Sequence, residues 1–196
     1  MYNCKLPAHF KNQTMHKHPF RKITVLAGIC CILLSACKKA EYYQLSQEEQ
    51  DEWSTYGANQ SFNFISTQGN LIPYKSGGLY RAYHQSGDLY EEYLYTAINR
   101  TDTSIESNVG GVFIDKKASG IEVKVGLPNF YKNVKINGLQ QTIQSINGKN
   151  YPDVYILVAD PLQTDSIHNI DSIFYSKAYG FLKYTDIYGE TYTITQ

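Results

Sequence analysis

Short runs that alternate between apolar and polar side chains fill the chain from residue 60 onward. The clearest is IEVKVGL, in which Ile121, Val123, Val125 and Leu127 fall on one face of an extended strand. Similar runs, rich in β-branched and aromatic residues, are SFNFIS, VGGVFID, VKI, TIQSI, DVYILVA, SIFYS, GFLKYT and TYTIT. This period of two predicts many short β-strands.

Glycine-containing pairs separate several of these runs. Asn137-Gly138, Asn147-Gly148 and Tyr188-Gly189 are typical of turns between strands. Many short strands at near-regular spacing predict a mainly β fold. We expect an antiparallel β-sandwich or half-barrel.

One segment before the strands has a helical signature. In LSQEEQDEW, residues 45–53, Ser46 and Glu49 have the spacing of a capping box, and the acidic first turn suits the helix dipole. We therefore expect one short N-terminal helix. Trp53, the only tryptophan, is expected to pack this helix onto the body of the domain.

The amino-terminal end predicts export and lipidation. The basic stretch HKHPFRK precedes thirteen mostly apolar residues, ITVLAGICCILLS, which are too few for a membrane span and typical of a secretory signal peptide. Leu34-Ser35-Ala36-Cys37 follows and resembles the lipobox of bacterial lipoproteins. We expect residues 1–36 to be removed, with Met15 as an alternative start. The sulfur of Cys37 would then carry a diacylglyceryl anchor.

The mature chain, residues 37–196, would contain thirteen Lys and Arg against eighteen Asp and Glu, a net charge of −5. This acidic balance argues against nucleic acid as a partner. Cys37 would be the only cysteine, which excludes disulfides, thiolate metal sites and a cysteine nucleophile. We expect residues 37–60 to form the anchor, tether and helix, and residues 61–196 a single β-rich domain.

Several motifs at the two ends of the domain resemble uncharacterised lipoproteins of Bacteroidota-type bacteria. They are SQEEQDEW followed by SFNFISTQGN, then INGKNYPDVYILVAD and IFYSKAYGFLKYTDIYGETYTI. The resemblance covers about a third of the chain and implies an outer-membrane location, facing the periplasm or the outside. It implies no particular activity.

Candidates for chemistry are few. Asp88 and Glu92 could serve a glycan hydrolase, but Ser86-Gly87-Asp88 is typical of a hairpin turn. The neighbours Glu91 and Glu92 would point to opposite faces of a strand and could not pair. Asp165, His168 and Asp171 lack a visible fourth ligand, so no metal is expected there. No catalytic motif or cofactor-binding loop is present in the sequence, and we expect no cofactor.

Tyrosine is abundant, with 17 in the mature part. Tyr80, Tyr83, Tyr90 and Tyr93, in the hairpin Leu79–Tyr95, are candidates for a ligand-binding face. The sequence therefore favours a non-enzymatic lipoprotein anchored in the outer membrane, which binds an envelope protein, a glycan or an apolar ligand. An envelope glycan hydrolase and a lipid carrier remain alternatives.

Two short repeats, Asp165-Ser166-Ile167 and Asp171-Ser172-Ile173, resemble the acceptor at which Bacteroidota-type bacteria O-glycosylate exported proteins. They lie in a polar segment between two strand runs. We expect Ser166 to be the better acceptor, because Ser172 borders the strand SIFYS.

Overall fold

The computed structural model describes residues 39–53, 56–102, 110–130, 134–159 and 169–195. The chain divides into two units, Met1–Glu41 and Tyr42–Gln196. Only residues 39–41 of the first unit belong to the described part, so nearly all of the described structure belongs to the second unit.

The second unit is mainly β, as the alternating runs predict. Its one described helix is α2 (Gln47–Trp53). The strands are β1 (Glu41–Tyr43), β2 (Ser61–Ser66), β3 (Leu71–Ser86), β4 (Leu89–Arg100), β5 (Gly110–Lys117), β6 (Gly120–Gly126), β7 (Val134–Lys135), β8 (Thr142–Ile146), β9 (Lys149–Val158), β10 (Ile170–Ser176), β11 (Gly180–Asp186) and β12 (Thr191–Thr195).

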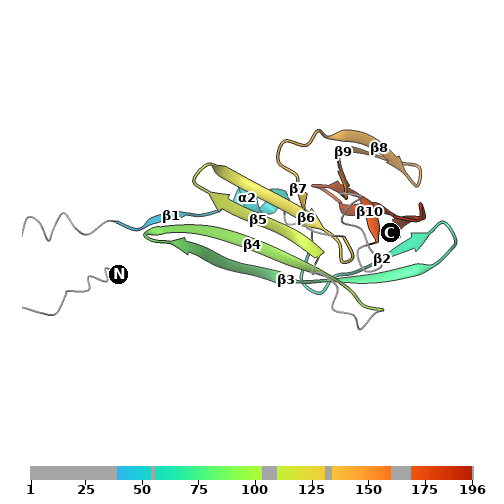
Figure 1. Ribbon diagram of the computed structural model, residues 1–196, viewed down its shortest axis with the longest axis horizontal. Helices are drawn as coiled ribbons and strands as arrows, with labels where there is room; N and C mark the ends of the chain where they lie inside the picture. Colours follow the sequence, from blue (N-terminus) through green and yellow to red (C-terminus); the bar gives the residue numbers. More distant parts are fainter. Residues whose placement is uncertain (1–38, 54–55, 103–109, 131–133, 160–168, 196) are drawn as a thin grey trace, which may run out of the picture. The chain divides into compact units, whose positions relative to one another are not determined.

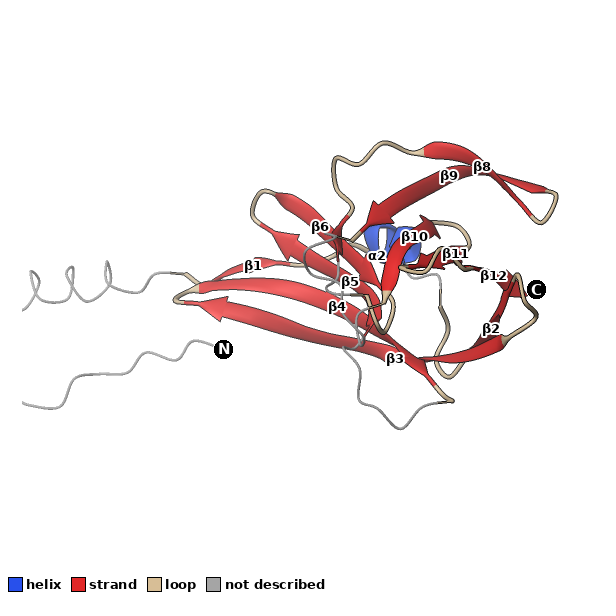
Figure 2. Cartoon of the chain, turned by 45° about the vertical axis from the view of Figure 1, so that its right-hand side comes forward, coloured by secondary structure: helices blue, strands red, loops and turns tan. Residues whose placement is uncertain are grey.

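The strands form one antiparallel sheet in the order β7-β6-β5-β4-β3-β2-β12-β11-β10-β9-β8, and β1 pairs with β4. Most neighbouring strands are consecutive in sequence and form hairpins. Strand β12 instead pairs with β2 and so joins the last strands of the domain to the first. The sheet curls into a half-barrel, which Figures 1 and 2 show from two directions. Of the two expected architectures, the half-barrel is confirmed.

The β3–β4 hairpin is the longest in the domain. It turns at Gly87, whose φ of 62° suits glycine, and this confirms the predicted turn. Part of the way along it, Gly77 and Gly78 together oppose the single residue Ala97, which is a β-bulge. Without this bulge, the side chains of β3 between the bulge and Gly87 would point to the opposite faces of the sheet. In both views the turn of the β3–β4 hairpin extends past the β5–β6 hairpin (Figures 1 and 2).

Helix α2 begins as predicted. The Ser46 N–H donates to Glu49 Oε2 at 2.8 Å, and the Glu49 N–H donates to Ser46 Oγ at 3.2 Å, which completes the capping box. Lys116 of β5 binds Glu49 at 2.5 Å, and Lys177, after β10, pairs with Glu52. Trp53 is buried in the core, as expected. The helix therefore joins the two halves of the sheet across the inner face.

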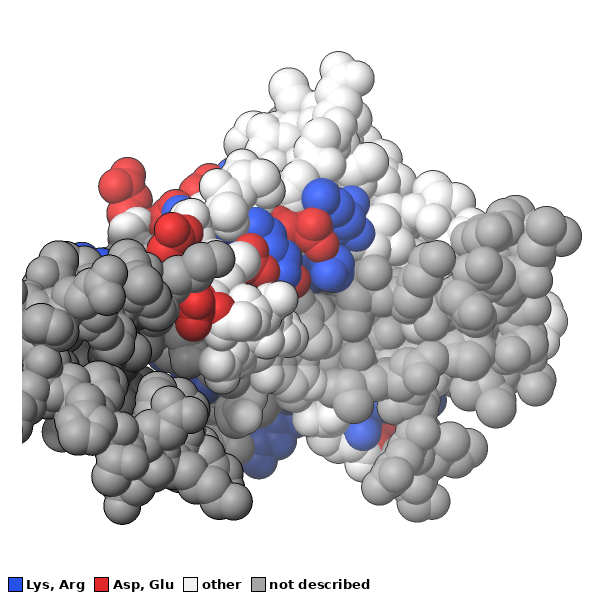
Figure 3. Space-filling view, turned by 60° about the vertical axis from the view of Figure 1, so that its left-hand side comes forward, with Lys and Arg blue, Asp and Glu red and all other residues white. Residues whose placement is uncertain are grey.

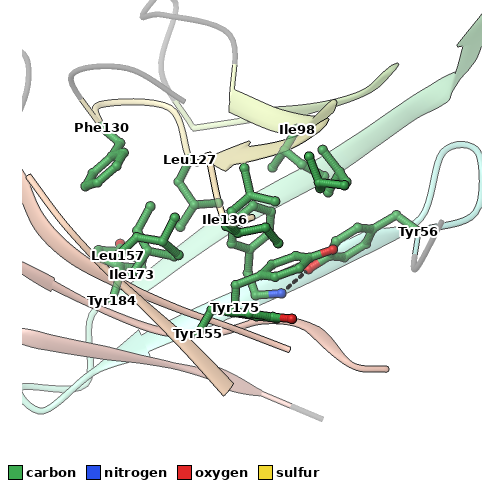
Figure 4. Packing of buried hydrophobic residues seen from close by; sticks show 14 of the residues in the cluster. Tyr56, Ile98, Leu127, Phe130, Ile136, Tyr155, Leu157, Ile173, Tyr175 and Tyr184 are labelled. Atoms are coloured by element: carbon green, nitrogen blue, oxygen red, sulfur yellow. Dashed lines mark hydrogen bonds between the residues drawn. The ribbon is translucent and has the colours of Figure 1, made fainter. Parts of the chain in front are cut away.

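The main core lies on this inner face, between the curled sheet and α2. Figure 4 shows its packing, with aliphatic side chains of β4, β9 and β10 around buried tyrosines. Tyr56 stacks between Phe62 and Phe181, and its hydroxyl accepts the Phe181 N–H at 2.6 Å. Burial removes that N–H from water, so the hydroxyl satisfies a donor that would otherwise be costly.

A second, smaller cluster lies on the other face of β9–β11. Along β9, Val154 belongs to this cluster and Tyr155 to the main core; along β11, Phe181 belongs to the main core and Leu182 to the second cluster. Leu182 is an extra residue in β11, because Lys183 pairs with Phe174 and Phe181 with the next residue, Tyr175. These strands are therefore covered on both faces. The second cluster is Ile146, Tyr151, Val154 and Leu182, with Phe174 packed against it.

Candidate functional site

A cavity in the described part of the chain lies beside the second cluster. It has a volume of about 460 Å³, within the range of small-ligand sites. Strands β2, β9, β11 and β12 and the turn after β10 contribute to it. We call it the cleft, and its lining residues are Gln60, Ser61, Phe62, Asn63, Tyr151, Tyr179, Leu182, Ile194 and Thr195.

Two tyrosines form one wall of the cleft. The rings of Tyr151 and Tyr179 meet edge to face, with centroids 5.1 Å apart. Lys149 Nζ lies 4.4 Å from the Tyr179 centroid, at cation–π distance. Tyr151 is buried, whereas Tyr179 is 46% exposed and borders solvent. The wall therefore combines a fixed ring with one that a ligand can reach.

The turn that carries Tyr179 is held by a small network. Ser176 Oγ bonds the Asp153 carboxylate at 2.9 Å, and the Tyr179 N–H donates to Ser176 Oγ at 3.2 Å. The Ala178 N–H also donates to Asp153, at 3.3 Å. Gly180 ends the turn at a φ of 75°. These contacts fix the backbone at Tyr179, so the wall exists before any ligand binds.

Amide and hydroxyl side chains form the rest of the lining together with the apolar Phe62, Leu182 and Ile194. Gln60 Oε1 accepts the Gly57 N–H at 3.1 Å, and Thr195 Oγ1 donates to the Asn63 carbonyl at 3.3 Å. Ser61 and Asn63 lie next to each other on one face of β2, and the apolar Phe62 is the residue between them in sequence. Each amide or hydroxyl can both donate and accept hydrogen bonds.

A smaller cavity of about 180 Å³ continues the cleft. It shares Tyr151, Ile194 and Thr195 with the cleft and adds Ile146, Asn147 and Lys149. Within the described residues that line the two cavities, none is Asp, Glu or His, and the one formal charge is that of Lys149. The described lining supplies hydrogen-bonding groups, ring surface and one positive charge.

The four tyrosines predicted as one ligand face lie on two faces of the hairpin. Tyr80 and Tyr93 are on the outer face, with ring centroids 6.2 Å apart, and His84 stacks on Tyr93 at 4.4 Å. Tyr83 and Tyr90 are on the inner face, where Tyr42 of β1 contacts both. The prediction that all four tyrosines form a single ligand face is therefore wrong.

The candidate carboxylates are also separated. Asp88 is exposed in the β3–β4 turn, whereas Glu92 is only 2% exposed on the inner face. Glu92 accepts the Leu45 N–H at 2.6 Å and pairs with Arg81 Nε at 3.1 Å. Glu91 lies on the opposite face, as expected for adjacent strand residues, and binds Lys117. Glu92 thus holds the chain before α2 onto the hairpin.

Outside this hairpin, the outer face of β5–β7 carries interleaved charges. Lys124 and Lys135 bind Glu122 at 2.8 and 2.7 Å, and these hydrogen bonds lower the pKa of Glu122 to about 2. Lys124 also reaches Asp115 at 3.5 Å. In Figure 3, basic and acidic side chains likewise interleave, and no broad field of one sign covers the face in view.

Several predicted sites lie outside the described residues: Cys37, Asp165, Ser166 and His168. Ser172 lies in β10, partly buried and paired on both sides, with Val158 and Thr185. No group of three His, Cys, Asp or Glu suited to a metal occurs among the residues that the structure describes. In the same part of the chain, α2 has seven residues, and no helix meets the length and apolarity of a bilayer span.

Sequence reasoning did not single out the cleft. Its lining comes from separate stretches of the chain, around Asn63, around Tyr151, around Tyr179 and around Thr195, and these stretches carry no local motif. The available signals were Asn147-Gly148, which predicts the β8–β9 hairpin, and the glycine that follows Tyr179. Comparisons with protein-family models, with curated proteins and with solved structures gave no match.

Proposed function

We propose that this protein is a non-enzymatic lipoprotein of the outer membrane whose cleft binds a carbohydrate chain. The observation that carries the proposal is the cleft lining: an exposed tyrosine beside amide and hydroxyl groups, without a carboxylate or histidine among the described lining residues. A cavity of about 460 Å³ has the size of a ligand site.

The lining chemistry favours a ligand rich in hydroxyl groups. Sugar hydroxyls both donate and accept hydrogen bonds, as do the side chains of Gln60, Asn63, Ser61 and Thr195. Tyrosine adds rigid area at a low entropy cost, and its ring can cover the apolar face of a sugar. An apolar ligand would cover these polar groups without offering them hydrogen bonds, which is unfavourable. The lining therefore supports a glycan better than a lipid.

The hydrolase alternative has weaker support. Glu92 is occupied by Arg81 and by the Leu45 N–H, while Asp88 is in an exposed turn. A glycosidase needs two carboxyl groups facing each other across the sugar, at about 5 to 9.5 Å. Neither residue lines the cleft.

The anchor part of the proposal rests on the signal sequence and on Cys37. Intact mass and detergent partitioning of the parent and of Cys37→Ala test it. We expect the parent to carry diacylglycerol and enter the detergent phase, and the variant to lose both properties. An unchanged mass and an unchanged membrane fraction for the variant would refute the anchor.

Calorimetric titration tests the cleft. The mature domain is titrated with neutral oligosaccharides of glucose, mannose or N-acetylglucosamine, and with uncharged peptides as a second ligand class. We expect at least one oligosaccharide series to bind, and Tyr179→Ala to weaken that binding by about tenfold, since loss of an aromatic contact is commonly about 1 to 2 kcal/mol.

Tyr188→Ala is the matched control. Tyr188 is 79% exposed, lies in the β11–β12 turn and is not part of the cleft lining. We expect this variant to bind like the parent. Equal losses in both variants, or binding of peptides alone, would contradict a carbohydrate site in the cleft.

A further inference from the structure

A second tyrosine cluster lies at the free end of the β3–β4 hairpin. The rings of Tyr42 and Tyr90 stack with centroids 4.6 Å apart, and Tyr83 meets Tyr42 edge-on at 6.5 Å. Tyr42 is 59% exposed and Tyr83 41%. We call these three residues the tip cluster. Exposed aromatic groups of this kind, with an apolar ring and a polar hydroxyl, suit the boundary between lipid and water.

The tip cluster also fixes where the amino-terminal tether leaves the domain. Strand β1 pairs with β4, and Gln44 donates to the Tyr83 hydroxyl at 3.0 Å. Farther along, the Leu45 N–H is held by the buried Glu92. These contacts attach the chain to the hairpin from Tyr42 onward.

Covalent geometry sets the distance to the proposed lipid. Tyr42 follows Cys37 by five residues. A fully extended chain spans at most about 3.6 Å per residue, so Tyr42 lies within about 18 Å of Cys37. The diacylglyceryl group places Cys37 at the bilayer surface, where the headgroup layer adds several ångströms on each side of the hydrocarbon core.

We infer that the tip cluster contacts the phospholipid headgroup layer of the membrane that holds the anchor. This inference rests on the proposed lipid anchor at Cys37. The contact would orient the domain. Tyr74 of β3 pairs with Phe62, which lines the cleft. Tyr74 precedes Tyr83 by nine residues along β3, a separation of about 30 Å. The membrane contact and the cleft would therefore lie at different ends of the hairpin, with the cleft directed away from the lipid.

Tryptophan substitutions test the contact. The mature chain, residues 37–196, contains both core clusters and has Cys37 as its sole thiol. Coupling this thiol to a maleimide phospholipid in vesicles supplies an anchor whether or not the cell attaches one. In vesicles with brominated lipids, we expect Tyr42→Trp emission to shift to the blue and to be quenched several-fold more than that of the parent, whose Trp53 is buried.

Tyr188→Trp is the control, because Tyr188 is at the far end of the domain. It precedes β12, and the Thr191 carbonyl at the start of β12 accepts the Thr67 N–H just after β2. The β2–β3 turn, which contains Thr67, lies at the opposite end of β3 from Gly87. We expect Tyr188→Trp to show no added quenching. Circular dichroism of both variants checks that the fold is retained.

The outcomes separate the two proposals. Weak quenching at both positions, or equal quenching at both, overturns the oriented contact. Vesicles of pure phosphatidylcholine and vesicles with added phosphatidylglycerol should give the same result if the aromatic rings, rather than charge, make the contact. The protein purified from cells, reconstituted in the same lipids, reports the native anchor. If the protein from cells lacks lipid, the anchor proposal fails. The thiol-coupled sample still tests whether the tip cluster contacts the membrane.

Discussion

Gly180→Ala should destabilise the domain strongly. Gly180 has a φ of 75°, a left-handed conformation that costs an alanine about 1 to 2 kcal/mol. A Cβ there would also lie 2.8 Å from Tyr56 Cε2 and closer still to the Tyr56 hydroxyl oxygen. Tyr56 is enclosed by Phe62 and Phe181, so its ring has little room to move.

The magnitude follows from the two consequences of moving Tyr56. Forcing a methyl group into a packed core costs about 1 to 3 kcal/mol. Displacing the hydroxyl also breaks its 2.6 Å hydrogen bond with the Phe181 N–H, and a buried unpaired N–H costs about 1 to 3 kcal/mol. With the backbone strain, the expected loss in free energy of unfolding is about 3 to 8 kcal/mol.

Gly189→Ala isolates the backbone strain. Gly189 has a φ of 84°, and nothing lies within 4 Å of the position of its Cβ. We expect this variant to lose only about 1 to 2 kcal/mol. Urea unfolding followed by circular dichroism measures both changes. If the two variants lose the same free energy, the overlap with Tyr56 is not significant and the proposed cause of the destabilisation is wrong.

Three further predictions concern charge and modification. Glu92→Ala should lower the free energy of unfolding by about 2 to 3 kcal/mol, because it leaves the Leu45 N–H without its acceptor and removes the carboxylate that pairs with Arg81. Asp88→Ala in the exposed turn should be near neutral, and equal denaturation midpoints for the two variants would contradict this. The pKa of Glu122 falls from 4.5 to about 2 on folding, so its stabilising effect is present above pH 4.5 and is lost as the pH falls toward 2. Glu122→Gln should flatten the acid branch of a stability–pH curve. An unchanged slope would count against the pairing of Glu122 with the two lysines. Glycopeptide mass spectrometry of protein from the native host should find a sugar on Ser166 rather than on Ser172, which is partly buried in β10; an unmodified peptide covering both would end this prediction.

Local patterns predicted the strands and the helix cap well. The alternation from Ile121 to Leu127 places Val123, Val125 and Leu127 in the core, where each is at most 1% exposed. Asn147-Gly148 adopts the positive φ values that a tight turn requires, and the Ser46 capping box forms as predicted. These features depend on neighbours in sequence, so one chain is enough to find them.

The split of the hairpin tyrosines was also within reach of sequence reasoning. Tyr80 and Tyr83 are three residues apart, as are Tyr90 and Tyr93, and an odd separation in a strand places two side chains on opposite faces. Which pair faces the core was not predictable, because the bulge at Gly77 and Gly78 sets it.

The cleft depends on long-range geometry. It forms because β12 pairs with β2 and so places Thr195 opposite Asn63, and because the extra residue Leu182 turns an apolar side chain to the second face of β11. Neither event leaves a period or a motif in the sequence. The proposed site was therefore found only once the sheet order was known.

Mapping a bound oligosaccharide by NMR tests the proposed function most directly. The ¹⁵N-labelled mature domain is titrated with the oligosaccharide series that binds in calorimetry, and amide shifts are followed residue by residue. If the cleft binds the carbohydrate, shifts concentrate at Asn63, Tyr179 and Thr195, which line it, while amides near Tyr42 and Tyr83 stay unchanged. Shifts confined to the tip cluster or to the outer face around Tyr93, with none in the cleft, would contradict a carbohydrate site there.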